Sequence, residues 1–416
     1  MTGALAGVRI VDISTSYAGP TATMYLADMG ADVVKVERPG GDDARAWGPP
    51  FVDGESAWFH SANRGKRSLA VDLRTPAGGE LVHRLLERAD VFVENLTTAK
   101  LAALGLDPDT VRARHPHLIY CAVSGFGFTG PDAATPGYDL VAQARSGLMS
   151  VTGARGGTPQ RVSTALSDIV TGLVAAFAVT AALHRRHRTG EGEFVDVSLL
   201  DTDLALMAPR IASYLAGEPE PAPSGGTDSV LAVYQAFETA DRPIIVAVGN
   251  DALWRRFCAA VELPELAADP ALATNEGRRQ ARPRILPAIA ARLAERPAAA
   301  WLARLGEASV PAYVIQSLSE VVADPQVRAR RAIAPLDNGL PVVAPPWRFG
   351  SAPPGAGPRP AIGPVGADAA SVLQDYGLAE AELAALLEAG ALIVPAGSTA
   401  EAAFAAAPQP PAEARR

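Results

Sequence analysis

The order of apolar and polar positions near the start of the chain predicts a strand, a helix and a second strand. Residues 8–13 form a short apolar run, which is typical of a buried strand, and Ala18-Gly19-Pro20 follows as a break. Residues 21–29 have the spacing of a helix, and Gly30 is a favourable C-terminal cap for it. Residues 32–37 predict the next strand. A βαβ unit of this kind predicts a parallel sheet with flanking helices.

The same alternation continues further along the chain. Residues 169–187 form a long stretch rich in Ala, Val and Leu, about the length of a buried helix in a large domain. The other elements predicted in this part are a helix at 78–89 and strands at 90–94, 118–124 and 193–199. Together these elements predict an α/β fold class.

A change of composition at residues 216–226, where Gly, Pro and Ser are concentrated, predicts a domain boundary. A chain of 416 residues also exceeds the size at which one hydrophobic core usually stops growing, so we expect two domains or one large domain with a substantial insertion. Residues 230–335 predict a separate α+β unit, with strands at 243–248 and 312–316 and helices around 252–261 and 282–306. A last helix is predicted at 378–391, and the tail 396–416, rich in Ala, Pro and Glu, is predicted to be disordered.

Charge and hydropathy argue against several classes of protein. The formal net charge of −8 argues against general nucleic-acid binding, which needs a concentrated positive field, but it still allows one anionic small ligand held by a few local basic groups. No run of about 18 or more apolar residues predicts a transmembrane helix. The first residues lack the basic-then-apolar pattern of a signal peptide. We therefore expect a cytoplasmic protein that does not bind a membrane.

Neither a metal site nor a dinucleotide site is predicted. The two cysteines, Cys121 and Cys258, form no cluster at metal-ligand spacing. The βαβ start has only Gly19 where a dinucleotide fingerprint needs three spaced glycines. We expect no metal and no prosthetic group.

Asp168 stands directly before the long apolar helix, and its position allows two interpretations. Asp is a favoured N-cap, and a carboxylate beside a helix N-terminus is stabilised by the helix dipole. The same environment suits a nucleophile, because it keeps the carboxylate ionised and offers N–H groups to an oxyanion. The residue types alone leave both interpretations open.

Two further groups of residues also have a structural and a chemical interpretation. Gly137-Tyr138-Asp139 leads into a helical run, either as a second cap with Tyr138 in the core or at a rim, or as part of a site. A set of basic residues within one stretch of chain forms either a solvated face or a phosphate pocket: Lys35, Arg38, Arg64, Lys66 and Arg67.

Taken together, these residues resemble the family III CoA transferases, which include formyl-CoA and carnitine-CoA transferases. The resemblance runs from about residue 5 to residue 395, through seven strings in family order. The strings are Ala18-Gly-Pro20 with Leu26–Glu37, Asn63–Ser68, Ala89–Asn95, Ser124–Gly127 with Thr129-Gly-Pro131, Gly137-Tyr-Asp139, Asp168, and Ala323–Arg328.

The resemblance implies an architecture in which two subunits interlock like links of a chain. Each subunit has a large Rossmann-like domain, built from both ends of the sequence, and a small domain from the middle. On this chain the implied division is 1–220 for the first part of the large CoA-binding domain, 221–335 for the small α+β domain and 336–395 for the return segment. The implied partners are an acyl-CoA, a free carboxylic acid and a second copy of the chain.

The resemblance also implies a mechanism in which coenzyme A is a substrate. Asp168 matches the family's aspartate, which attacks the acyl-CoA thioester to give an aspartyl-acyl mixed anhydride and free CoA thiolate. An incoming carboxylate then exchanges into the acyl position, and CoA returns to the new acid. Tyr138 and Asp139 match a Tyr-acidic pair beside the reacting thioester. The residues implied to contact CoA are Tyr17, Ala18, Arg38, Lys66, Leu69 and Asn95.

Two alternatives come from the same superfamily, an α-methylacyl-CoA racemase and a CoA-dependent lyase. The racemases have Gly-His-Asp where this chain has Gly137-Tyr138-Asp139, and epimerisation needs an acid and a base on opposite faces of the enolate. One of the two is missing here, because a tyrosine ordinarily ionises near pH 10. A non-catalytic CoA-binding protein is a third alternative, and the presence of Asp168 argues against it.

The chain departs from the family pattern at three places. Tyr17 stands near the position of a Gln in the formyl-CoA enzymes, so their small-acid specificity is not expected here. Leu96-Thr97-Thr98 replaces an Arg-Pro-Gly string, which removes a CoA-phosphate contact or moves it elsewhere. The glycine-rich loop that covers the site in some members is reduced to Ser224-Gly225-Gly226.

Overall fold

The computed structural model describes residues 3–52, 54–350 and 359–395, and the chain divides into two compact units. The first unit is built from the residues up to Gly147, from Val162–Ala212 and from Gln326 onward; the second contains Leu148–Arg161 and Ser213–Pro325. This partition differs from the predicted division chiefly in residues 148–161, which pair with the second unit because Gly225 N donates to Gly153 O at 3.0 Å. The predicted disordered tail, 396–416, lies outside the described residues.

The first unit is built on a seven-stranded sheet with the order β14-β5-β2-β1-β6-β7-β8. Its six parallel strands are β1 (Arg9–Asp12), β2 (Asp32–Glu37), β5 (Lys66–Val71), β6 (Val91–Glu94), β7 (Ile119–Ser124) and β8 (Glu193–Ser198). The short edge strand β14 (Leu392–Ile393) runs antiparallel to β5. In chain order the parallel strands are arranged 3-2-1-4-5-6, which is the order of a doubly wound sheet. The predicted α/β class and large parallel sheet are confirmed.

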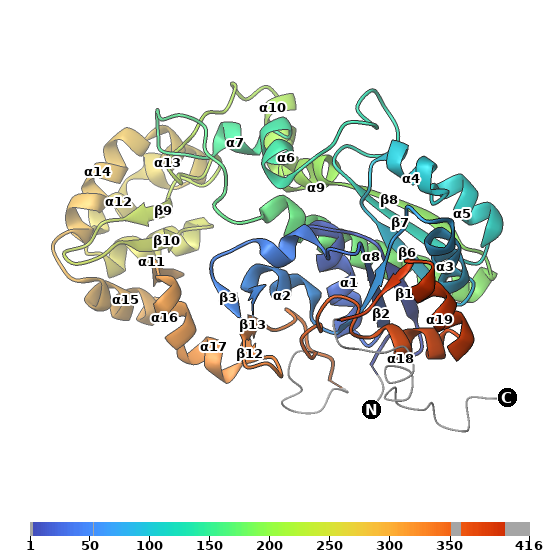
Figure 1. The fold of residues 1–416 in the computed structure, drawn as a ribbon. Helices are drawn as coiled ribbons and strands as arrows, with labels where there is room; N and C mark the ends of the chain where they lie inside the picture. Colours follow the sequence, from blue (N-terminus) through green and yellow to red (C-terminus); the bar gives the residue numbers. More distant parts are fainter. Residues whose placement is uncertain (1–2, 53, 351–358, 396–416) are drawn as a thin grey trace. The chain divides into compact units, whose positions relative to one another are not determined.

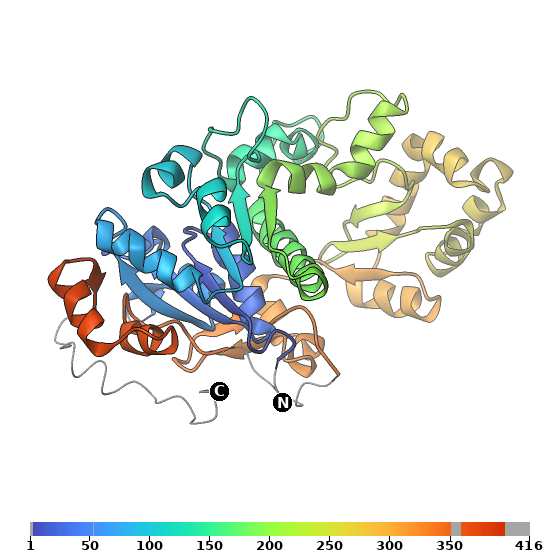
Figure 2. The same ribbon diagram turned by 90° about the vertical axis from the view of Figure 1, so that its right-hand side faces the viewer.

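Alternate residues of the central strands enter two separate cores, as the side-chain period of two requires. Ile10 and Val33 belong to the core under α1 (Ala18–Asp28) and α8 (Leu166–Thr189). Val11 and Val34 belong to the core under α3 (Pro76–Leu86), α18 (Ala369–Asp375) and α19 (Glu380–Glu388). The C-terminal helices α18 and α19 thus lie beside elements from the start of the chain, as Figures 1 and 2 show.

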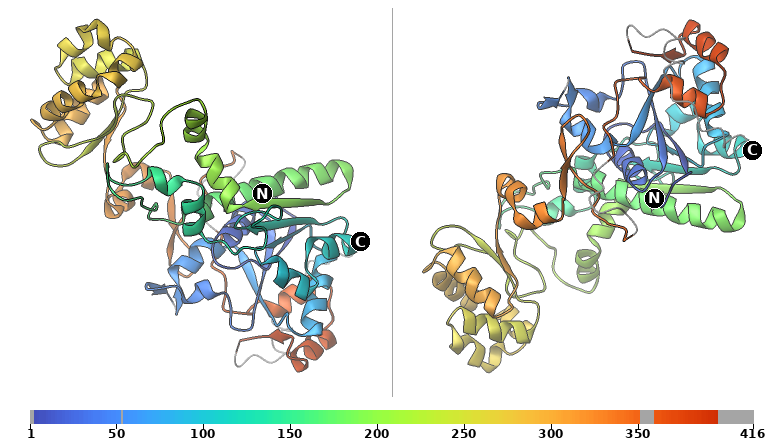
Figure 3. Two further views of the ribbon diagram at one scale, coloured as in Figure 1. Left: turned by 90° about the horizontal axis from the view of Figure 1, so that it is seen from above. Right: turned by 90° about the horizontal axis from the view of Figure 1, so that it is seen from below.

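Helices α1 and α8 approach each other closely because residue 172 is a glycine. A Cβ built on Gly172 would lie 2.7 Å from the Thr21 Cβ and 2.9 Å from the Ala18 carbonyl oxygen, so any side chain there would push the helices apart. The long helix α8 lies along the sheet (Figure 3). The contact with α1 fixes the N-terminal turn of α8, which carries Asp168, beside the N-terminal turn of α1.

Most predicted elements occur within a few residues of their predicted bounds, with one correction in α1. Ala18-Gly19-Pro20, predicted as a break, is the first turn of α1, where Pro20 lacks only an N–H that would have no partner in the helix. The remaining elements of the first unit that matter below are α2 (Ala57–Asn63), α4 (Thr98–Leu104), α5 (Pro108–Arg114), α6 (Asp139–Arg145), α9 (Leu199–Leu206) and the hairpin of β12 (Ile333–Pro335) and β13 (Pro341–Val343).

Helix α8 has the length and apolar composition of a membrane-spanning helix, although the sequence pattern predicted none. Its apolar character has a local cause, because Ala175, Ala176 and Val179 are buried in the core beneath the sheet. A core helix satisfies the same criterion of length and composition.

The second unit has a three-stranded antiparallel sheet in the order β11-β10-β9. The strands are β9 (Tyr234–Phe237), β10 (Ile244–Ala247) and β11 (Ala312–Val314), and the helices include α11 (Asp251–Ala260), α12 (Pro264–Ala268), α13 (Asn275–Gln280), α14 (Arg282–Leu293), α15 (Ala298–Glu307) and α16 (Leu318–Ala323). Trp254 and Trp301 are fully buried in its core. The helical stretch predicted at 282–306 is two helices, α14 and α15, with Pro297 as the N-cap of the second.

Candidate active site

Two cavities share wall residues at the carboxyl ends of the strands where the strand order reverses. Strands β1 and β6 are neighbours in the sheet but are followed by connections to opposite sides, and this arrangement leaves a crevice in which open α/β sheets bind ligands. Thr15, which follows β1, and Leu96, which follows β6, line both cavities. We name them the Arg38 cavity, of ≈ 390 Å³, and the Asp168 cavity, of ≈ 260 Å³.

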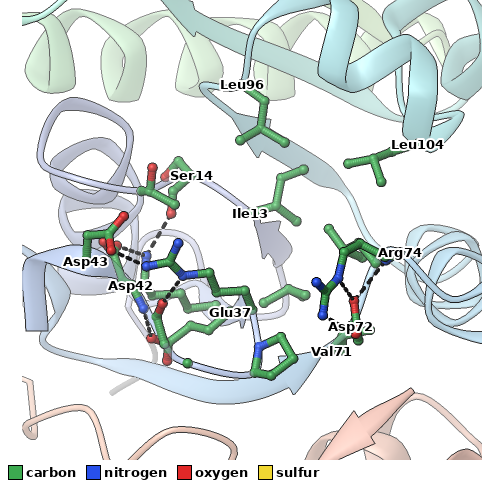
Figure 4. A pocket seen from close by; sticks show the side chains of 18 of the residues that line it. Ile13, Ser14, Glu37, Asp42, Asp43, Val71, Asp72, Arg74, Leu96 and Leu104 are labelled. Atoms are coloured by element: carbon green, nitrogen blue, oxygen red, sulfur yellow. Dashed lines mark hydrogen bonds and ion pairs between the residues drawn. The ribbon is translucent and has the colours of Figure 1, made fainter. Parts of the chain in front are cut away.

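The Arg38 cavity has two exposed arginines in its wall, each next to one carboxylate. Arg38 is paired with Asp43, and Arg74 is paired with Asp72 at 2.7 Å. Ile13 lies between the two pairs (Figure 4). Exposed pairs of this kind contribute little stability, so an anionic ligand can replace either carboxylate at small cost. Arg38 therefore lines a cavity in which its guanidinium is available to an anionic ligand, and its predicted contact with CoA stays a prediction.

A group of paired, buried charges, which we call the ionic scaffold, adjoins this cavity; its members are Asp12, Lys35, Asp42 and Lys66. Lys35 Nζ lies 2.9 Å from Asp42 Oδ2, and Lys66 Nζ lies 3.1 Å from Asp12 Oδ2. Burial alone would raise the pKa of Asp12, but the charges of Lys66 and Lys35 and a hydrogen bond from Ser14 hold that pKa below its ordinary value. The scaffold fixes the loop after β1, because Lys35 Nζ also donates to the Ser14 carbonyl at 2.7 Å.

Two predicted CoA contacts, Lys66 and Leu69, lie in β5 and face the interior. Lys66 Nζ donates to Asp12 and, at 2.9 Å, to the Pro20 carbonyl, and its side chain is fully buried. Leu69 is fully buried in the core. Neither residue lines either cavity, so the prediction that both contact CoA is corrected. Leu73, which follows the same strand, lines the Arg38 cavity instead.

The other three predicted contacts, Tyr17, Ala18 and Asn95, line the Asp168 cavity. The Asn95 amide is already used, because its Nδ2 donates to Thr15 O at 2.8 Å and its Oδ1 accepts from Thr15 N at 2.9 Å. The Tyr17 hydroxyl lies 2.8 Å from Ser61 Oγ. Burial raises the pKa of Tyr17 against the effect of that hydrogen bond. Asn95 therefore positions the loop, and Tyr17 and Ala18 form the wall at the start of α1.

Another part of the wall of the Asp168 cavity is a contact between two glycine backbones. A Cβ on Gly137 would lie 2.4 Å from the Gly125 Cα, and one on Gly125 would lie 2.6 Å from the Gly137 Cα. Glycine is required at both positions because the two backbone segments touch there. The contact presents Tyr138, which is 63% exposed, at the rim of the cavity. Two of the family strings, Ser124–Gly127 and Gly137–Asp139, are therefore one structural unit.

Asp168 is the third residue of α8 and not its cap. The N-cap of α8 is Ala165, whose side chain forms no capping bond. Asp139 satisfies the helix terminus instead, because its Oδ2 accepts from Ser167 N at 2.9 Å while its Oδ1 accepts from Gln143 Nε2 at 2.7 Å. Asp168 is half-buried, lines the cavity, and accepts no hydrogen bond and forms no ion pair within the described part of the chain. The cap interpretation of Asp168 is wrong.

Asp168 lies in a group of three acidic residues, Asp139, Asp168 and Asp203, which we call the carboxylate cluster. Asp203 is fully buried; one oxygen accepts from Ser167 Oγ at 2.7 Å, and Oδ1 has no partner among the described residues. Burial raises the pKa of Asp168 to about 7, and the negative charges of Asp139 and Asp203 add to the rise. The expected stabilisation of the ionised form by the helix N-terminus is therefore outweighed.

Sequence reasoning missed two residues of the site, Asp203 and Lys100. Asp203 lies on the buried side of α9 together with Leu199, and that i, i+4 spacing was the signal that could have found it. Lys100, in α4, lines both the Arg38 and the Asp168 cavities. Within residues 3–52, 54–350 and 359–395, no group of three His, Cys, Asp or Glu side chains could hold a metal ion.

A doubly wound sheet with two cavities at the reversal of its strand order, one of them lined by a carboxylate that has no partner among the described residues, is the arrangement of an α/β protein that binds a ligand at the carboxyl ends of its strands. The chain belongs to CoA-transferase family III, whose sequence profile matches residues 5–368. It is a CoA transferase, an enzyme of a family that transfers CoA between carboxylic acids, with CoA thioesters as substrates.

Known relatives cover most of the chain. The succinyl-CoA:glutarate CoA-transferase of Mus musculus is 43% identical over 337 residues, which are 81% of this chain and 76% of that protein. The succinyl-CoA:mesaconate CoA-transferase of Haloarcula hispanica is 38% identical over 346 residues, which are 81% of this chain and 86% of that protein. The crystal structure of a CAIB/BAIF family protein from Brucella suis, 37% identical, matches with a TM-score of 0.79 and covers 90% of this chain and 100% of that chain.

Proposed function

We propose that this enzyme transfers CoA between dicarboxylic acids through a covalent anhydride on Asp168. The observation that carries the proposal is a half-buried carboxylate that lines a cavity at the end of the sheet and has no hydrogen-bond donor or cation of its own among the described residues. A carboxylate in that position serves no visible structural purpose, and its environment makes it more basic than an ordinary aspartate. Both relatives described above have dicarboxylic acids in their names.

The reaction has three balanced steps. An Asp168 oxygen attacks the thioester carbonyl carbon, the carbon–sulfur bond breaks, and CoA leaves as the thiolate, which gives an aspartyl-acyl anhydride. The acceptor carboxylate attacks the Asp168 acyl carbon and expels the donor acid, which gives a second anhydride. The CoA thiolate attacks the acceptor carbonyl carbon of that anhydride, so that acceptor-CoA forms and Asp168 is released as a carboxylate. No net proton transfer and no ATP are required.

The carboxylate cluster favours the first step. Acylation of Asp168 removes one negative charge from a site where Asp139 and Asp203 already raise its pKa. The ionised aspartate is thus held at a higher free energy than it would have alone in water, and forming the neutral anhydride relieves that repulsion. Asp139 also holds the first turn of α8 in place through Ser167.

CoA is proposed to lie across the two cavities, with its phosphates toward Arg38 and its thioester toward Asp168. Arg38, Arg74 and Lys100 supply positive charge along that route, and Lys100 takes the place of the family's arginine that is missing after Asn95. Tyr138, at the rim, is proposed to contact the reacting end. The 3-2-1-4-5-6 strand order supports the Rossmann-like description of the large domain. An interlocked homodimer and a cytoplasmic location stay predictions.

Trapping with hydroxylamine tests the covalent step. Enzyme incubated with succinyl-CoA and hydroxylamine should acquire a hydroxamate on the peptide that contains Asp168, visible by mass spectrometry, because hydroxylamine attacks the Asp168 acyl carbon of the anhydride and releases succinate. Asp168→Asn provides the blank, and Asp109→Asn, an exposed residue of α5, provides the charge-matched control. Efficient CoA exchange without any modification of this peptide would overturn the proposal.

The racemase and lyase alternatives differ from the proposal in the bond that changes. A racemase exchanges the α-proton of its acyl-CoA with solvent, whereas the three steps above leave that proton in place. In deuterated water we expect exchange of labelled CoA between acids without deuterium at the α-carbon. Deuterium incorporation without CoA exchange would favour a racemase, and formation of an unsaturated acid would favour a lyase.

A further inference from the structure

A third cavity, of ≈ 450 Å³, shares a wall with the site of Asp168, and we call it the Arg330 cavity. Tyr17 lines both this cavity and the Asp168 cavity. Two consecutive residues of α8 also line different cavities: Asp168 lines the Asp168 cavity and Ile169 lines the Arg330 cavity. An acyl group attached to Asp168 therefore begins at the boundary of the Arg330 cavity.

The walls of the Arg330 cavity combine apolar side chains with scattered polar ones. Met24 from α1, Ile169 from α8 and Val343 from β13 supply apolar surface. Thr21 also lines it, and its buried Oγ1 has no hydrogen-bond partner among the described residues. Such a lining suits the methylene chain of a small acid, with room for a polar group at its far end.

Three arginines line the cavity, and two of them have no anionic partner among the described residues. Arg64 is satisfied, because it donates to the Asp28 carboxylate at 2.6 and 3.1 Å. Arg330 and Arg348 are exposed, and their side chains form no ion pair and no hydrogen bond within the described residues. No described Asp or Glu lines this cavity. It therefore has a positive lining that is not neutralised from within the wall.

A dicarboxylic substrate bound beside Asp168 needs a positive charge near its second carboxylate. The carboxylate cluster is negative, and a dicarboxylic acid brings a second carboxylate that takes no part in the reaction. Among the described residues, the unpaired cations that line the Asp168 cavity or the Arg330 cavity are Lys100, Arg330 and Arg348. Lys100 lines the wall that the Asp168 cavity shares with the Arg38 cavity. Of these three described cations, Arg330 and Arg348 are therefore the two that line the Arg330 cavity.

We infer that the Arg330 cavity binds the distal carboxylate of the dicarboxylic substrate, with Arg330 and Arg348 as the residues that determine specificity for a diacid over a monoacid. This inference rests on the proposed function, since it places the acyl chain relative to Asp168. A guanidinium presents parallel N–H donors to a carboxylate and is the side chain best matched to that group. A monocarboxylic acid of equal length gains nothing from either arginine.

The test compares acceptors that differ only at the far end. With succinyl-CoA as donor, kcat/KM is measured for glutarate and for pentanoate in the full-length enzyme and in Arg330→Gln, Arg348→Gln and the double variant. We expect each single variant to lower kcat/KM for glutarate by about 10- to 100-fold, the effect of losing one hydrogen-bonded charge partner, and to change pentanoate little. The lysine variants at the same positions keep the charge and should retain part of the preference.

The controls separate this inference from the proposed function. Arg188→Gln removes the same charge from the exposed C-terminal turn of α8, lines none of these cavities, and should leave both acceptors unaffected. An unchanged ratio of glutarate to pentanoate in the double variant overturns the inference while CoA exchange and the Asp168 hydroxamate persist. So does a wild-type enzyme that exchanges CoA only among monoacids. Loss of the hydroxamate with every donor overturns the proposed function itself.

Discussion

The ionic scaffold and the carboxylate cluster are both groups of buried charged side chains in the first unit, but they balance charge in opposite ways. In the scaffold, Lys35 and Lys66 each lie within 3.1 Å of a carboxylate, and the pKa of Asp12 is lowered. In the cluster, Asp168 lies beside two further carboxylates, Asp139 and Asp203, and burial together with their negative charge raises its pKa to about 7. Burial is common to Asp12 and Asp168, so the sign of the neighbouring charges decides the direction in which the pKa of each carboxylate moves.

The difference between the two groups suggests a structural role for the ionic scaffold and a chemical role for the carboxylate cluster. The scaffold ties the loop after β1 to two strands and contains few polar atoms without a partner, so it fixes the geometry of the Arg38 cavity. The cluster leaves the Asp168 carboxylate in the cavity wall without a hydrogen bond from any residue that the structure describes, at a cost in stability. We expect substitutions in the scaffold to affect folding and substitutions in the cluster to affect catalysis.

The largest expected effect is the loss of turnover when the nucleophile is removed. Asp168→Asn keeps the shape and the helix but cannot form an anhydride, so kcat for CoA transfer should fall by at least about 10⁴-fold, as for other covalent catalysts without their nucleophile. Steady-state assays with succinyl-CoA and glutarate check this. Retained turnover in a preparation shown by mass spectrometry to be free of wild-type protein would falsify the nucleophile assignment.

Breaking the scaffold should instead lower stability. Asp12→Asn removes the carboxylate beside Lys66, a buried group whose pKa is already lowered by burial to about 7. Losing one partner of a buried ion pair costs about 3–5 kcal/mol, but Lys66 can reduce that cost by releasing its proton, so we expect a loss of about 1–3 kcal/mol. We expect the free energy of unfolding, measured with urea, to fall accordingly. Asp109→Asn on the surface should change that free energy by less than about 0.5 kcal/mol. A variant as stable as the wild type would mean that the scaffold does not hold this loop.

Neutralising Asp168 in the carboxylate cluster should raise the free energy of unfolding, whereas breaking the ionic scaffold should lower it. An acid with a raised pKa contributes nothing below its unfolded value of 3.8, destabilises increasingly from there to about pH 7, and destabilises fully above that pH. Asp168→Asn should therefore stabilise the fold by roughly 2–4 kcal/mol at pH 8 and by about 1 kcal/mol at pH 5. Urea unfolding at both pH values measures the difference. An equal gain at both would show that the charge is not its cause.

The same contrast explains which features could be predicted from the sequence. The parallel strands were predictable because strands covered on both faces are mostly apolar along their length, as at 8–13 and 118–124. Strand β5 was missed because it begins Lys66-Arg67-Ser68, and these polar side chains find their partners far away in the sequence. Arg67, for example, pairs with Asp375 at 2.7 Å.

The site was predictable only where family strings supplied it. Asp168 was located from its neighbours in the family pattern, while its local sequence suggested a cap that Asp139 in fact provides. Lys66 and Leu69 were misplaced because sequence cannot tell which face of a strand a residue occupies when both faces are buried. Asp203 was missed because its burial beside Ser167 depends on how α9 packs on α8. These are all tertiary properties.

The smallest expected effect is a shift in the pH profile, and it tests the carboxylate cluster most directly. In the proposed mechanism the ionised form of Asp168 attacks the thioester, so kcat/KM should rise about tenfold per pH unit below 7 and level off above it. Asp203→Asn removes one neighbouring negative charge while its amide oxygen can still accept from Ser167. The pKa of Asp168 should then fall, and the midpoint should move to lower pH, so the variant keeps more of its plateau activity at pH 6 than the wild type does. Asp201→Asn, exposed on the same helix, should leave the midpoint in place. An unmoved midpoint in Asp203→Asn would show that burial alone, and not repulsion within the cluster, sets the reactivity of Asp168.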